Sequence, residues 1–398
     1  MKIVYFANFI NHHQANVSDC LYEMTEHNYT FVELCPIYDW LLKSGYSDLS
    51  SKPYVLQAWK SKDNMDKALR LIDVADVFLY AGPEAQSIAK KCAITGKLCF
   101  EVGERSFKKG WLNLLSPNLQ KHIWNYFSVY RKHNVYRLCA SAYSARDLYT
   151  LNMYRGKYYK WGYFTTVDDH LNVETSLDVS TSEITPLMWC SRFLKWKHPE
   201  LPILMAKKLK DKGFHFHLDM FGSGEKLEVS KQLVEDLKLN DVITFRGNVP
   251  NASILQEMRK HEIFLFTSDQ NEGWGAVSNE SMASGCVLVG ADMIGSVPFL
   301  VEDGKTGLIF RSADKTTGFN GTSLKIDNNA LASLTQKVEW LLNNPKERNR
   351  LSKNGYNVMR KVWSPENAAK NLLILINDLQ NGRDTSIQHG PCSIALPI

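Results

Sequence analysis

Two carboxylates in the second half of the chain are spaced so that both can reach one small ligand. Glu272 lies in the glycine-containing segment Glu272-Gly-Trp-Gly275, and Glu280 lies about two turns further along a predicted helix. Gly273 and Gly275 allow backbone N–H groups to approach a ligand, and the helix start favours an anion such as a diphosphate. The carboxylates would accept hydrogen bonds from ligand hydroxyls. The alternative is that Glu272 caps the helix and Glu280 is a solvated surface acid.

Basic residues follow another predicted strand, Leu187–Cys190, where it ends. They are Arg192, Lys195 and Lys197. In a parallel α/β sheet the carboxyl ends of the strands open onto the ligand crevice, so these cations would point toward whatever the Glu272 loop holds. Arginine and lysine both compensate phosphate oxygens and a leaving diphosphate. A solvated basic turn is the alternative.

A third segment with glycines, Gly222-Ser-Gly224, follows the predicted strand Phe214–Phe221. A G-x-G pair alone is a weak signal, and an ordinary tight turn explains it equally well. Three such loops in one domain nevertheless indicate a single anion-binding crevice at the strand ends.

The elements that must position these loops follow from the hydrophobic pattern. Short apolar runs alternate with longer amphipathic stretches, which predicts an α/β fold of parallel sheets covered on both faces. The strands expected in the first half are Lys2–Phe9, Val77–Tyr80, Leu98–Val102 and Leu138–Ala140. Those expected in the second half are Leu187–Cys190, Phe214–Phe221, Val242–Phe245, Ile263–Thr267 and Val287–Val289.

The polar segment Thr165–Glu183 is the expected linker between a domain at 1–165 and a domain at 184–362. Three helices are expected near the C-terminus, at Ala330–Leu342, Lys346–Val362 and Pro365–Leu379. Residues 381–398 have no periodicity, so we expect a frayed tail there.

Composition excludes several classes of protein. The length of 398 residues is too great for a single small binding module, and the net charge of +5 is too small for a dedicated nucleic-acid binder. Eight cysteines without a C-x-x-C pair suggest free thiols in a reducing compartment. Since we find neither a secretory signal nor a run of about 18 apolar residues, we expect a cytoplasmic protein, at most peripheral on the inner face of the membrane.

Further motifs join the three loops in a fixed order along the chain. The full set is Arg192 with Lys197, Gly222-Ser-Gly224, Phe245-Arg-Gly247 with Val249-Pro250, Glu272 with Glu280, Gly285, and Glu302-Asp-Gly-Lys-Thr-Gly307. Over residues 187–310 this set resembles the donor domain of the glycosyltransferase family 4 enzymes, of GT-B fold. The resemblance implies two Rossmann-like domains that face each other across a cleft, with the last helix crossing back to the N-terminal domain.

The resemblance also implies a retaining transfer of a sugar from a nucleoside diphosphate sugar, with no metal or other cofactor. Arg192 and Lys197 would neutralise the diphosphate, and Glu272 would hold the donor sugar. The departing phosphate would take the acceptor proton. The expected donor-binding residues are Ser191, Gly222, Gly273, Trp274, Gly275 and Glu280, with Trp274 beside the sugar and Glu280 at the ribose hydroxyls. The sequence contains no D-x-D pair, which agrees with metal-free transfer.

The first candidate in the N-terminal half is a histidine pair. Asn11-His-His-Gln14 stands where many members of the family carry a glycine pair. His13, or its neighbour His12, would donate a hydrogen bond to a phosphate or shuttle a proton, because imidazole titrates near neutrality. Histidines that cap the helix or lie on the surface are the alternative.

The second candidate is Glu104, in a segment where the family often has a functional histidine. Residues 100–108 contain no histidine, so we expect Glu104, or alternatively Glu101, to replace it, with Arg105 as a charge partner. A surface Glu–Arg pair is the other interpretation. Together with Lys160-Trp-Gly-Tyr-Phe164, these segments look most like bacterial enzymes of capsule or O-antigen assembly.

The positive charge of the chain is concentrated between residues 105 and 146. This stretch has eight Lys or Arg residues, no Asp or Glu, and many aromatic residues. We expect a basic aromatic helix around Pro117–His133 that lies on anionic lipid headgroups near a lipid-linked acceptor. A half-buried helix is the alternative, and nothing resembles a nucleic-acid module.

The sequence therefore predicts a glycosyltransferase of cell-surface polysaccharide biosynthesis that acts on a saccharide or lipid-linked saccharide. Two rival hypotheses stay open at this point. One is a nucleotide-sugar isomerase or epimerase of the same fold, and the other is a non-catalytic protein that binds a sugar nucleotide or a polysaccharide.

Overall fold

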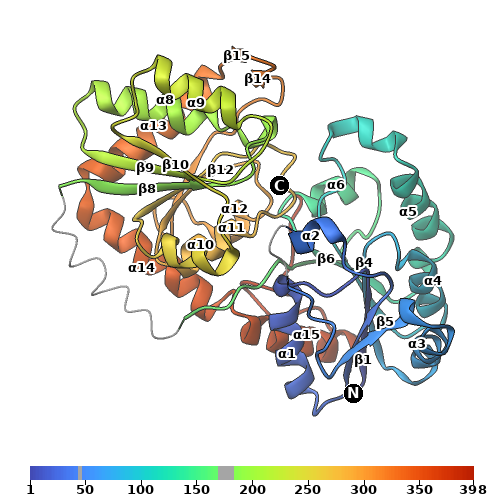
Figure 1. Ribbon diagram of the computed structural model, residues 1–398. Coiled ribbons are helices and arrows are strands. Elements are labelled where there is room, and N and C mark those ends of the chain that lie inside the picture. Colours follow the sequence, from blue (N-terminus) through green and yellow to red (C-terminus); the bar gives the residue numbers. More distant parts are fainter. Residues whose placement is uncertain (44–46, 169–182) are drawn as a thin grey trace. The chain divides into compact units, whose positions relative to one another are not determined.

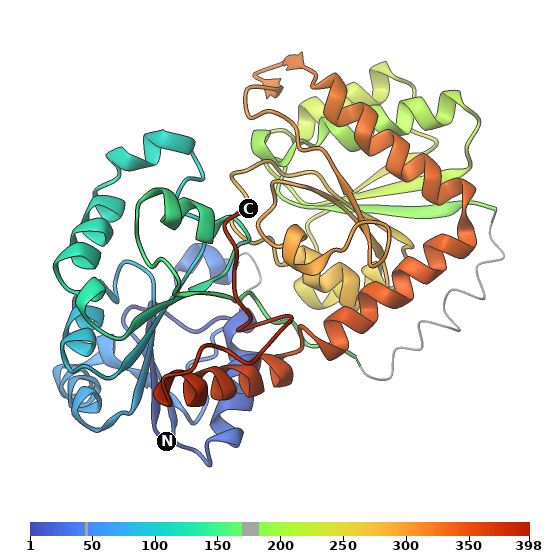
Figure 2. The same ribbon diagram turned by 180° about the vertical axis from the view of Figure 1, so that it is seen from behind.

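The computed structural model describes residues 1–43, 47–168 and 183–398 (Figures 1 and 2). The chain divides into two units, the first made of residues 1–166 and 362–398 and the second of residues 167–361. Most of the segment expected to be a linker, residues 169–182, lies outside the described residues.

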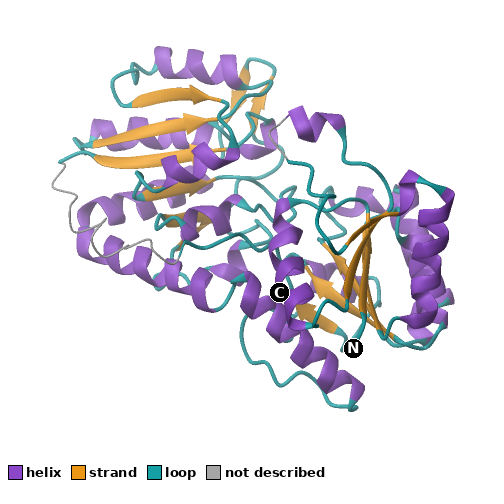
Figure 3. Ribbon diagram, turned by 60° about the horizontal axis from the view of Figure 1, so that its bottom comes forward, coloured by secondary structure: helices purple, strands orange, loops and turns teal. Residues whose placement is uncertain are grey.

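The first unit has a parallel sheet of seven strands in the order β3-β2-β1-β4-β5-β6-β7. The strands are β1 (Ile3–Ala7), β2 (Tyr29–Glu33), β3 (Val55–Gln57), β4 (Val77–Ala81), β5 (Leu98–Gly103), β6 (Val135–Cys139) and β7 (Tyr158–Lys160). Its α-helices are α1 (His12–Met24), α2 (Asp39–Lys43), α3 (Lys62–Val74), α4 (Gln86–Ile94), α5 (Pro117–Ser128), α6 (Ser144–Thr150) and α15 (Pro365–Gln380). Three short 3₁₀ segments are η1 (Ala58–Lys60), η2 (Gly110–Leu115) and η3 (Tyr130–Lys132). Helices cover both faces of the sheet (Figure 3), with α1 on one face and α3 and α4 on the other (Figure 1).

The last helix packs on the first. Helix α15 lies against α1 (Figure 2), with Leu372, Leu375 and Ile376 fully buried. The Ser364 side chain caps α15 by accepting a hydrogen bond from the Asn367 N–H, and Pro365 occupies the first turn, where a missing N–H costs nothing. The expected crossing of this helix onto the N-terminal domain is confirmed.

The expectation of a frayed tail over residues 381–398 is wrong. Cys392 is fully buried, its N–H donates to the Lys160 carbonyl at 2.7 Å, and the Lys160 N–H donates to the Ser393 carbonyl at 2.8 Å. Tyr159 and Ile394 form an antiparallel bridge. The tail therefore pairs with β7, an edge strand whose backbone groups would otherwise lack partners.

The second unit has a parallel sheet of six strands in the order β10-β9-β8-β11-β12-β13. These are β8 (Thr185–Cys190), β9 (Phe216–Phe221), β10 (Ile243–Gly247), β11 (Ile263–Phe266), β12 (Val287–Ala291) and β13 (Leu308–Phe310), followed by a hairpin of β14 (Gly318–Asn320) and β15 (Ser323–Lys325). The helices are η4 (Lys195–Lys197), α8 (Glu200–Asp211), α9 (Leu227–Asp236), α10 (Asn251–Met258), α11 (Val277–Ala283), α12 (Val297–Leu300), α13 (Asn328–Asn343) and α14 (Pro345–Lys361). Helices α8, α9 and α13 cover one face of the sheet, and α10, α11 and α14 cover the other (Figure 1). The predicted class, two Rossmann-like α/β domains with parallel sheets, is confirmed.

The order of strands determines where a ligand is expected in the second unit. Strand β8 pairs with β9 on one side and with β11 on the other, so the chain winds in opposite directions from this point. Ligands of open α/β sheets bind outside the carboxyl ends of strands at such a switch. The residues that follow β8 and β11 are therefore the natural place for a site.

Among the described residues, no helix is both long enough and apolar enough to cross a lipid bilayer.

Candidate active site

The loops after β8 and β11 are bonded to each other at the switch point of the second unit. The Thr267 hydroxyl accepts a hydrogen bond from the Trp189 indole N–H at 2.9 Å and donates one to the Lys197 carbonyl at 2.7 Å. The Asp269 N–H donates to the Trp196 carbonyl at 3.0 Å. These bonds hold the basic segment predicted after β8 beside the acidic, glycine-containing loop predicted after β11.

Lys197 and Glu272 form an ion pair at this junction. Their side chains are only 11% and 12% exposed, so the pair is shielded from most of the solvent. The Lys197 ammonium also lies 4.2 Å from the centre of the Trp196 ring, a cation–π contact. Two residues predicted to share one site are thus brought together, and the low local polarity strengthens their action on any charged ligand.

Glu280 is a buried residue of the first turn of α11, 6% exposed. Burial raises the pKa of the Cys190 thiol at the end of β8 to about 12, and the charge of Glu280 adds to that rise. The negative charge of Glu280 is therefore felt by the Cys190 thiol at the end of β8. The alternative that Glu280 is a solvated surface acid is wrong, and so is a capping role for Glu272, because no side chain caps α11.

Arg192 is exposed and forms no ion pair with any residue that the structure describes. The neighbouring backbone is fixed, because the Ser191 N–H donates to the Phe221 carbonyl at 3.1 Å. The guanidinium thus stands at the carboxyl end of β8 without an intramolecular counter-charge in the described chain, which suits the binding of an anion.

The glycines of Gly222-Ser-Gly224 are required by the packing of one loop on another. Gly222 has φ +123°, and a Cβ added there would lie 2.0 Å from the Ser191 carbonyl oxygen. A Cβ at Gly224 would lie 2.6 Å from the Phe193 carbonyl oxygen. The close approach that these glycines permit is to the chain itself, so a donor-binding role of Gly222 stays a prediction.

Trp274 does not line an open pocket with its side chain. The indole is fully buried and donates a hydrogen bond to the Asn279 side-chain oxygen at 2.8 Å. Its neighbour Gly275 has φ +83°, and a Cβ there would lie 2.4 Å from the Phe266 ring. The expectation that the Trp274 ring shapes a sugar pocket is therefore wrong, and Trp274 instead anchors the Gly273–Gly275 segment to the core.

A buried histidine beneath the site was missed by the sequence analysis. His198 Nδ1 lies 2.7 Å from Glu200 Oε1, its Nε2 lies 3.6 Å from Asp269 Oδ2, and all three side chains are at most 2% exposed. Burial alone would lower the pKa of His198, but the nearby charges of Asp269 and Glu200, together with the hydrogen bond to Glu200, raise it to about 9. An imidazolium thus joins the loop after β8 to the loop after β11. The only sequence signal was a histidine directly after Lys197, with one acid near it in each loop.

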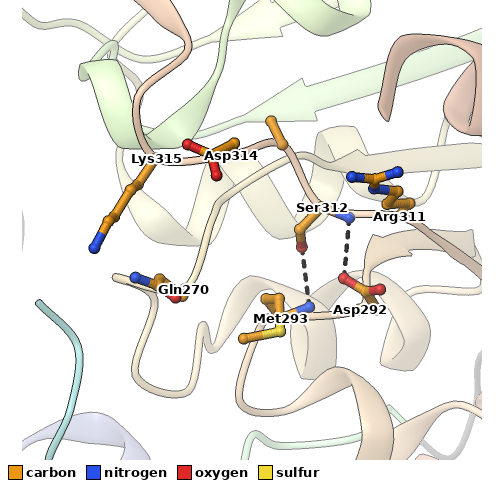
Figure 4. Close-up of a pocket in the computed structure, with 8 residues that line it drawn as sticks. Gln270, Asp292, Met293, Arg311, Ser312, Asp314 and Lys315 are labelled. Atoms are coloured by element: carbon orange, nitrogen blue, oxygen red, sulfur yellow. Dashed lines mark hydrogen bonds between the residues drawn. The ribbon is translucent and has the colours of Figure 1, made fainter. Parts of the chain in front are cut away.

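A pocket of about 330 Å³ lies beside the same loops, at the carboxyl ends of β12 and β13 (Figure 4). It is lined by Gln270, Asp292, Met293, Arg311, Ser312, Ala313, Asp314 and Lys315. Asp292 accepts a hydrogen bond from the Ser312 N–H at 2.9 Å, which ties the two strand ends together. This polar lining can bind hydroxyl groups, and no motif in the sequence predicted it.

In the first unit, Tyr163 joins the two predicted residues His13 and Glu104. The Tyr163 hydroxyl donates to Glu104 Oε1 at 2.6 Å, and its ring stacks on the His13 ring with centroids 5.3 Å apart. His13 lies in the first turn of α1, where Asn11 caps the helix. Burial, together with the charge of His12, holds the pKa of His13 well below its usual value, so this imidazole is neutral.

The expected charge partner of Glu104 is wrong. Arg105 pairs with Asp147 at 3.4 Å, with both side chains 3% exposed, whereas Glu104 pairs with Lys108. The Asp147 carboxylate also accepts a hydrogen bond from the Phe107 N–H at 2.8 Å, so it is held close to Arg105.

Glu101, the alternative candidate, is held by three partners. It accepts hydrogen bonds from His122 at 2.9 Å and Tyr154 at 2.6 Å and lies 3.0 Å from an Arg137 nitrogen. Burial alone would raise the pKa of Glu101, but the charges of His122 and Arg137 hold it well below its usual value. With its carboxylate committed to this buried cluster, Glu101 is a structural residue, and Glu104 is the candidate that a ligand can reach.

The second unit matches a known protein family in sequence. Residues 187–358 match the family of group 1 glycosyl transferases. The matched segment begins in β8 and ends in α14, so it contains both loops of the switch point. It also contains Arg192, Lys197, Glu272 and Glu280.

One curated relative is the poly(glycerol-phosphate) alpha-glucosyltransferase of Bacillus subtilis (strain 168), 35% identical over 92 residues. That match spans 23% of this chain and only 13% of the relative.

Solved structures with the same fold cover most of the chain. Alr3699/HepE of Anabaena, determined in complex with UDP, is 12% identical with a TM-score of 0.66, over 96% of this chain and all of that one. A point mutant of TarM from S. aureus, in complex with fondaparinux, alpha-GlcNAc-glycerol and UDP, is 16% identical with a TM-score of 0.56, over 79% of this chain and 59% of that one. The predicted GT-B fold class is confirmed by these likenesses.

Proposed function

We propose that this protein is a glycosyltransferase that moves a sugar from a nucleoside diphosphate sugar to a saccharide or lipid-linked saccharide. The observation that carries the proposal is the Lys197–Glu272 pair at the switch point, because an ammonium beside a carboxylate suits a ligand with both phosphates and hydroxyls. The match of this segment to group 1 glycosyl transferases supports the same chemistry. UDP is present in both of the similar solved structures described above, so UDP-sugars are the first donors to test.

In the proposed reaction the anomeric carbon keeps its configuration, as in family 4. The bond from that carbon to the diphosphate oxygen breaks while the acceptor oxygen bonds to the same face, and the departing phosphate oxygen takes the acceptor proton. Arg192 and Lys197 compensate the charge that develops on the diphosphate, in place of a metal ion. Glu272 accepts hydrogen bonds from the donor sugar once Lys197 turns to the phosphates, and Glu280 binds the ribose hydroxyls.

Ser191, Gly222 and the Gly273–Gly275 segment contribute backbone groups to donor binding in this proposal. Tight packing of these loops on the chain itself favours a preformed site, since the N–H groups need no rearrangement when the donor binds.

The first unit binds the acceptor in this proposal. Glu104 accepts a hydrogen bond from an acceptor hydroxyl, and the neutral His13 donates one to a phosphate oxygen or passes a proton. Tyr163 contacts both side chains and so fixes their positions relative to each other.

The acceptor that we propose is a growing cell-surface polysaccharide, of capsule or O-antigen type. The name of one curated relative contains poly(glycerol-phosphate), and one similar structure contains alpha-GlcNAc-glycerol, so a polymeric or glycerol-linked saccharide acceptor is the first class to test. We place the enzyme on the cytoplasmic side of the membrane, where nucleotide sugars are available.

The test has two stages. Thermal melting is first measured with a panel of UDP-sugars and other nucleotide sugars, because a donor at 100 times its dissociation constant stabilises the folded state by about 2.7 kcal/mol. Release of the nucleoside diphosphate is then measured with the stabilising donor, with and without a panel of saccharide acceptors and with EDTA present.

Acceptor-dependent release that survives EDTA, with a product of retained anomeric configuration, is the expected result. Conversion of the donor into another nucleotide sugar without any acceptor would identify an isomerase instead. Donor binding without either reaction across the panel would identify a binding protein. Either outcome contradicts the proposal.

A further inference from the structure

The first unit exposes a group of large apolar side chains next to each other in the chain. Leu115, Trp124, Leu112 and Trp111 are 75%, 71%, 70% and 67% exposed, the four highest values among the large apolar residues that the structure describes. Three of them lie in η2, and Trp124 lies in α5, which contacts η2. Single exposed apolar residues are ordinary, but a cluster of this kind marks an interaction surface.

Helix α5 has two distinct faces. Leu119, His122 and Tyr126 point inward, and His122 bonds to Glu101, whose side chain is 13% exposed. The opposite face carries Trp124 and the 37% exposed Phe127. Since the inner face is anchored to the core, the outer aromatic side chains are displayed by a fixed helix.

Exposed cations surround these apolar groups. Lys109 precedes η2, Lys121 lies one turn before Trp124, and Arg131 with Lys132 follows α5. None of these four side chains forms an ion pair with a described residue, and no Asp or Glu occurs between residues 105 and 146. Uncompensated positive charge beside apolar side chains is complementary to a surface that is negative outside and apolar beneath.

We propose that η2 and α5 form a membrane-docking surface that inserts Trp111, Leu112, Leu115 and Trp124 into the headgroup region of an anionic lipid bilayer. Lys109, Lys121, Arg131 and Lys132 contact the lipid phosphates. Tryptophan suits this position because its ring is apolar and its N–H reaches water or headgroups. This inference is independent of the proposed catalytic activity, since it concerns only where the chain resides.

The experiment is co-sedimentation of the full chain with vesicles of phosphatidylcholine alone and of phosphatidylcholine with phosphatidylglycerol. We expect binding to the anionic vesicles only, weakened by added salt because exposed charges are screened. Two variants are compared with the parent: Trp111→Ser with Trp124→Ser, and Lys121→Glu with Arg131→Glu. Each should weaken vesicle binding at least about tenfold while the melting temperature stays unchanged.

Matched controls come from the same unit. Val74→Ser with Ile94→Ser changes side chains that are 57% and 59% exposed on other elements, and Lys90→Glu with Lys91→Glu reverses two exposed charges on α4. Both controls should bind vesicles like the parent.

Three outcomes of the vesicle experiment would overturn the proposal. They are absence of vesicle binding, equal binding to the two kinds of vesicle, and equal loss of binding in the controls. Light scattering in the absence of lipid tests whether the chain binds a second copy of itself. If the parent self-associates and the tryptophan variant does not, the surface joins two copies of the chain and the membrane assignment is wrong.

Discussion

The two units place a histidine at equivalent points and give it opposite character. His13 lies in the first turn of the helix after β1, and His198 precedes the helix after β8, each strand being an interior strand of its sheet that is followed by the sheet's first crossover. His198 lies between Glu200 and Asp269, and its pKa rises to about 9. His13 lies against Tyr163 and His12, and its pKa falls well below the usual value. The same topology therefore holds a charged imidazolium, His198, in one unit and a neutral imidazole, His13, in the other.

The difference shows what each strand-end loop is suited to do. In the second unit the buried charges lie in ion pairs between loops, which fixes a rigid site for a highly charged ligand. In the first unit the corresponding groups meet through a neutral tyrosine, which suits an uncharged hydroxyl acceptor.

The largest effect is expected for Glu272→Gln, which removes the negative partner of Lys197. Arg192→Ala is the second variant, and it removes one of the two cations of the site. Each should lower turnover by about 10³-fold, because each removes an electrostatic contact with the donor. Turnover is measured as nucleoside diphosphate release, and the melting temperature reports the fold. Glu228→Gln, on an exposed acid of α9, serves as the control, and near-normal turnover of both site variants would refute the site.

His198 should make stability depend on pH in a direction that can be worked out. Since its folded-state pKa of about 9 exceeds the unfolded value of 6.5, its stabilising effect is complete below pH 6.5 and is lost as pH rises through 9. The free energy involved is on the order of 3 kcal/mol. Denaturant unfolding at pH 6.5 and above pH 9 measures the effect, and His198→Gln should flatten the profile over this window. An unchanged profile in the variant would contradict the ion-paired imidazolium.

The two histidines can also be distinguished directly. NMR titration of the ring protons should give a midpoint above the usual 6.5 for His198 and below it for His13. Because a neutral His13 keeps its state across the physiological range, lowering the pH from 8 to 7 should leave it uncharged. Similar titration midpoints for His198 and His13 would show that the two units do not hold their histidines in different charge states.

The smallest effect is expected for Tyr163→Phe, which removes the hydrogen bond to Glu104 and keeps the ring on His13. The acceptor KM should rise about tenfold while the donor KM stays constant, because a lost hydrogen bond to a charged group is worth about 1.5 kcal/mol or more. Tyr38→Phe is the matched control, since Tyr38 also donates to a glutamate, Glu84, at an exposed position. An equal change in both KM values would show that Tyr163 supports the fold rather than the acceptor side.

Local pattern was a good guide to the second unit and a poorer one to short strands. Strands β8 to β12 and their loops follow from apolar runs that end in glycine, basic or acidic residues. Strands β2, β3, β7, β13, β14 and β15 were missed, and all of these except β2 have only three residues, too few for a periodic signal. Pairing of the tail with β7 could not be predicted either, because the tail pairs with an edge strand that is far away in the sequence.

The chain's own order of residues suffices to define two parallel α/β sheets and the strand-end motifs, because apolar periodicity and glycine placement act over a few neighbours. Tertiary packing alone decided which charges meet: Lys197 with Glu272, Arg105 with Asp147 instead of Glu104, and His198 with two carboxylates. It also decided that the Trp274 ring is core and that Trp111 and Trp124 are surface. Burial and electrostatic pairing depend on distances between segments remote in sequence, and no local pattern contains them.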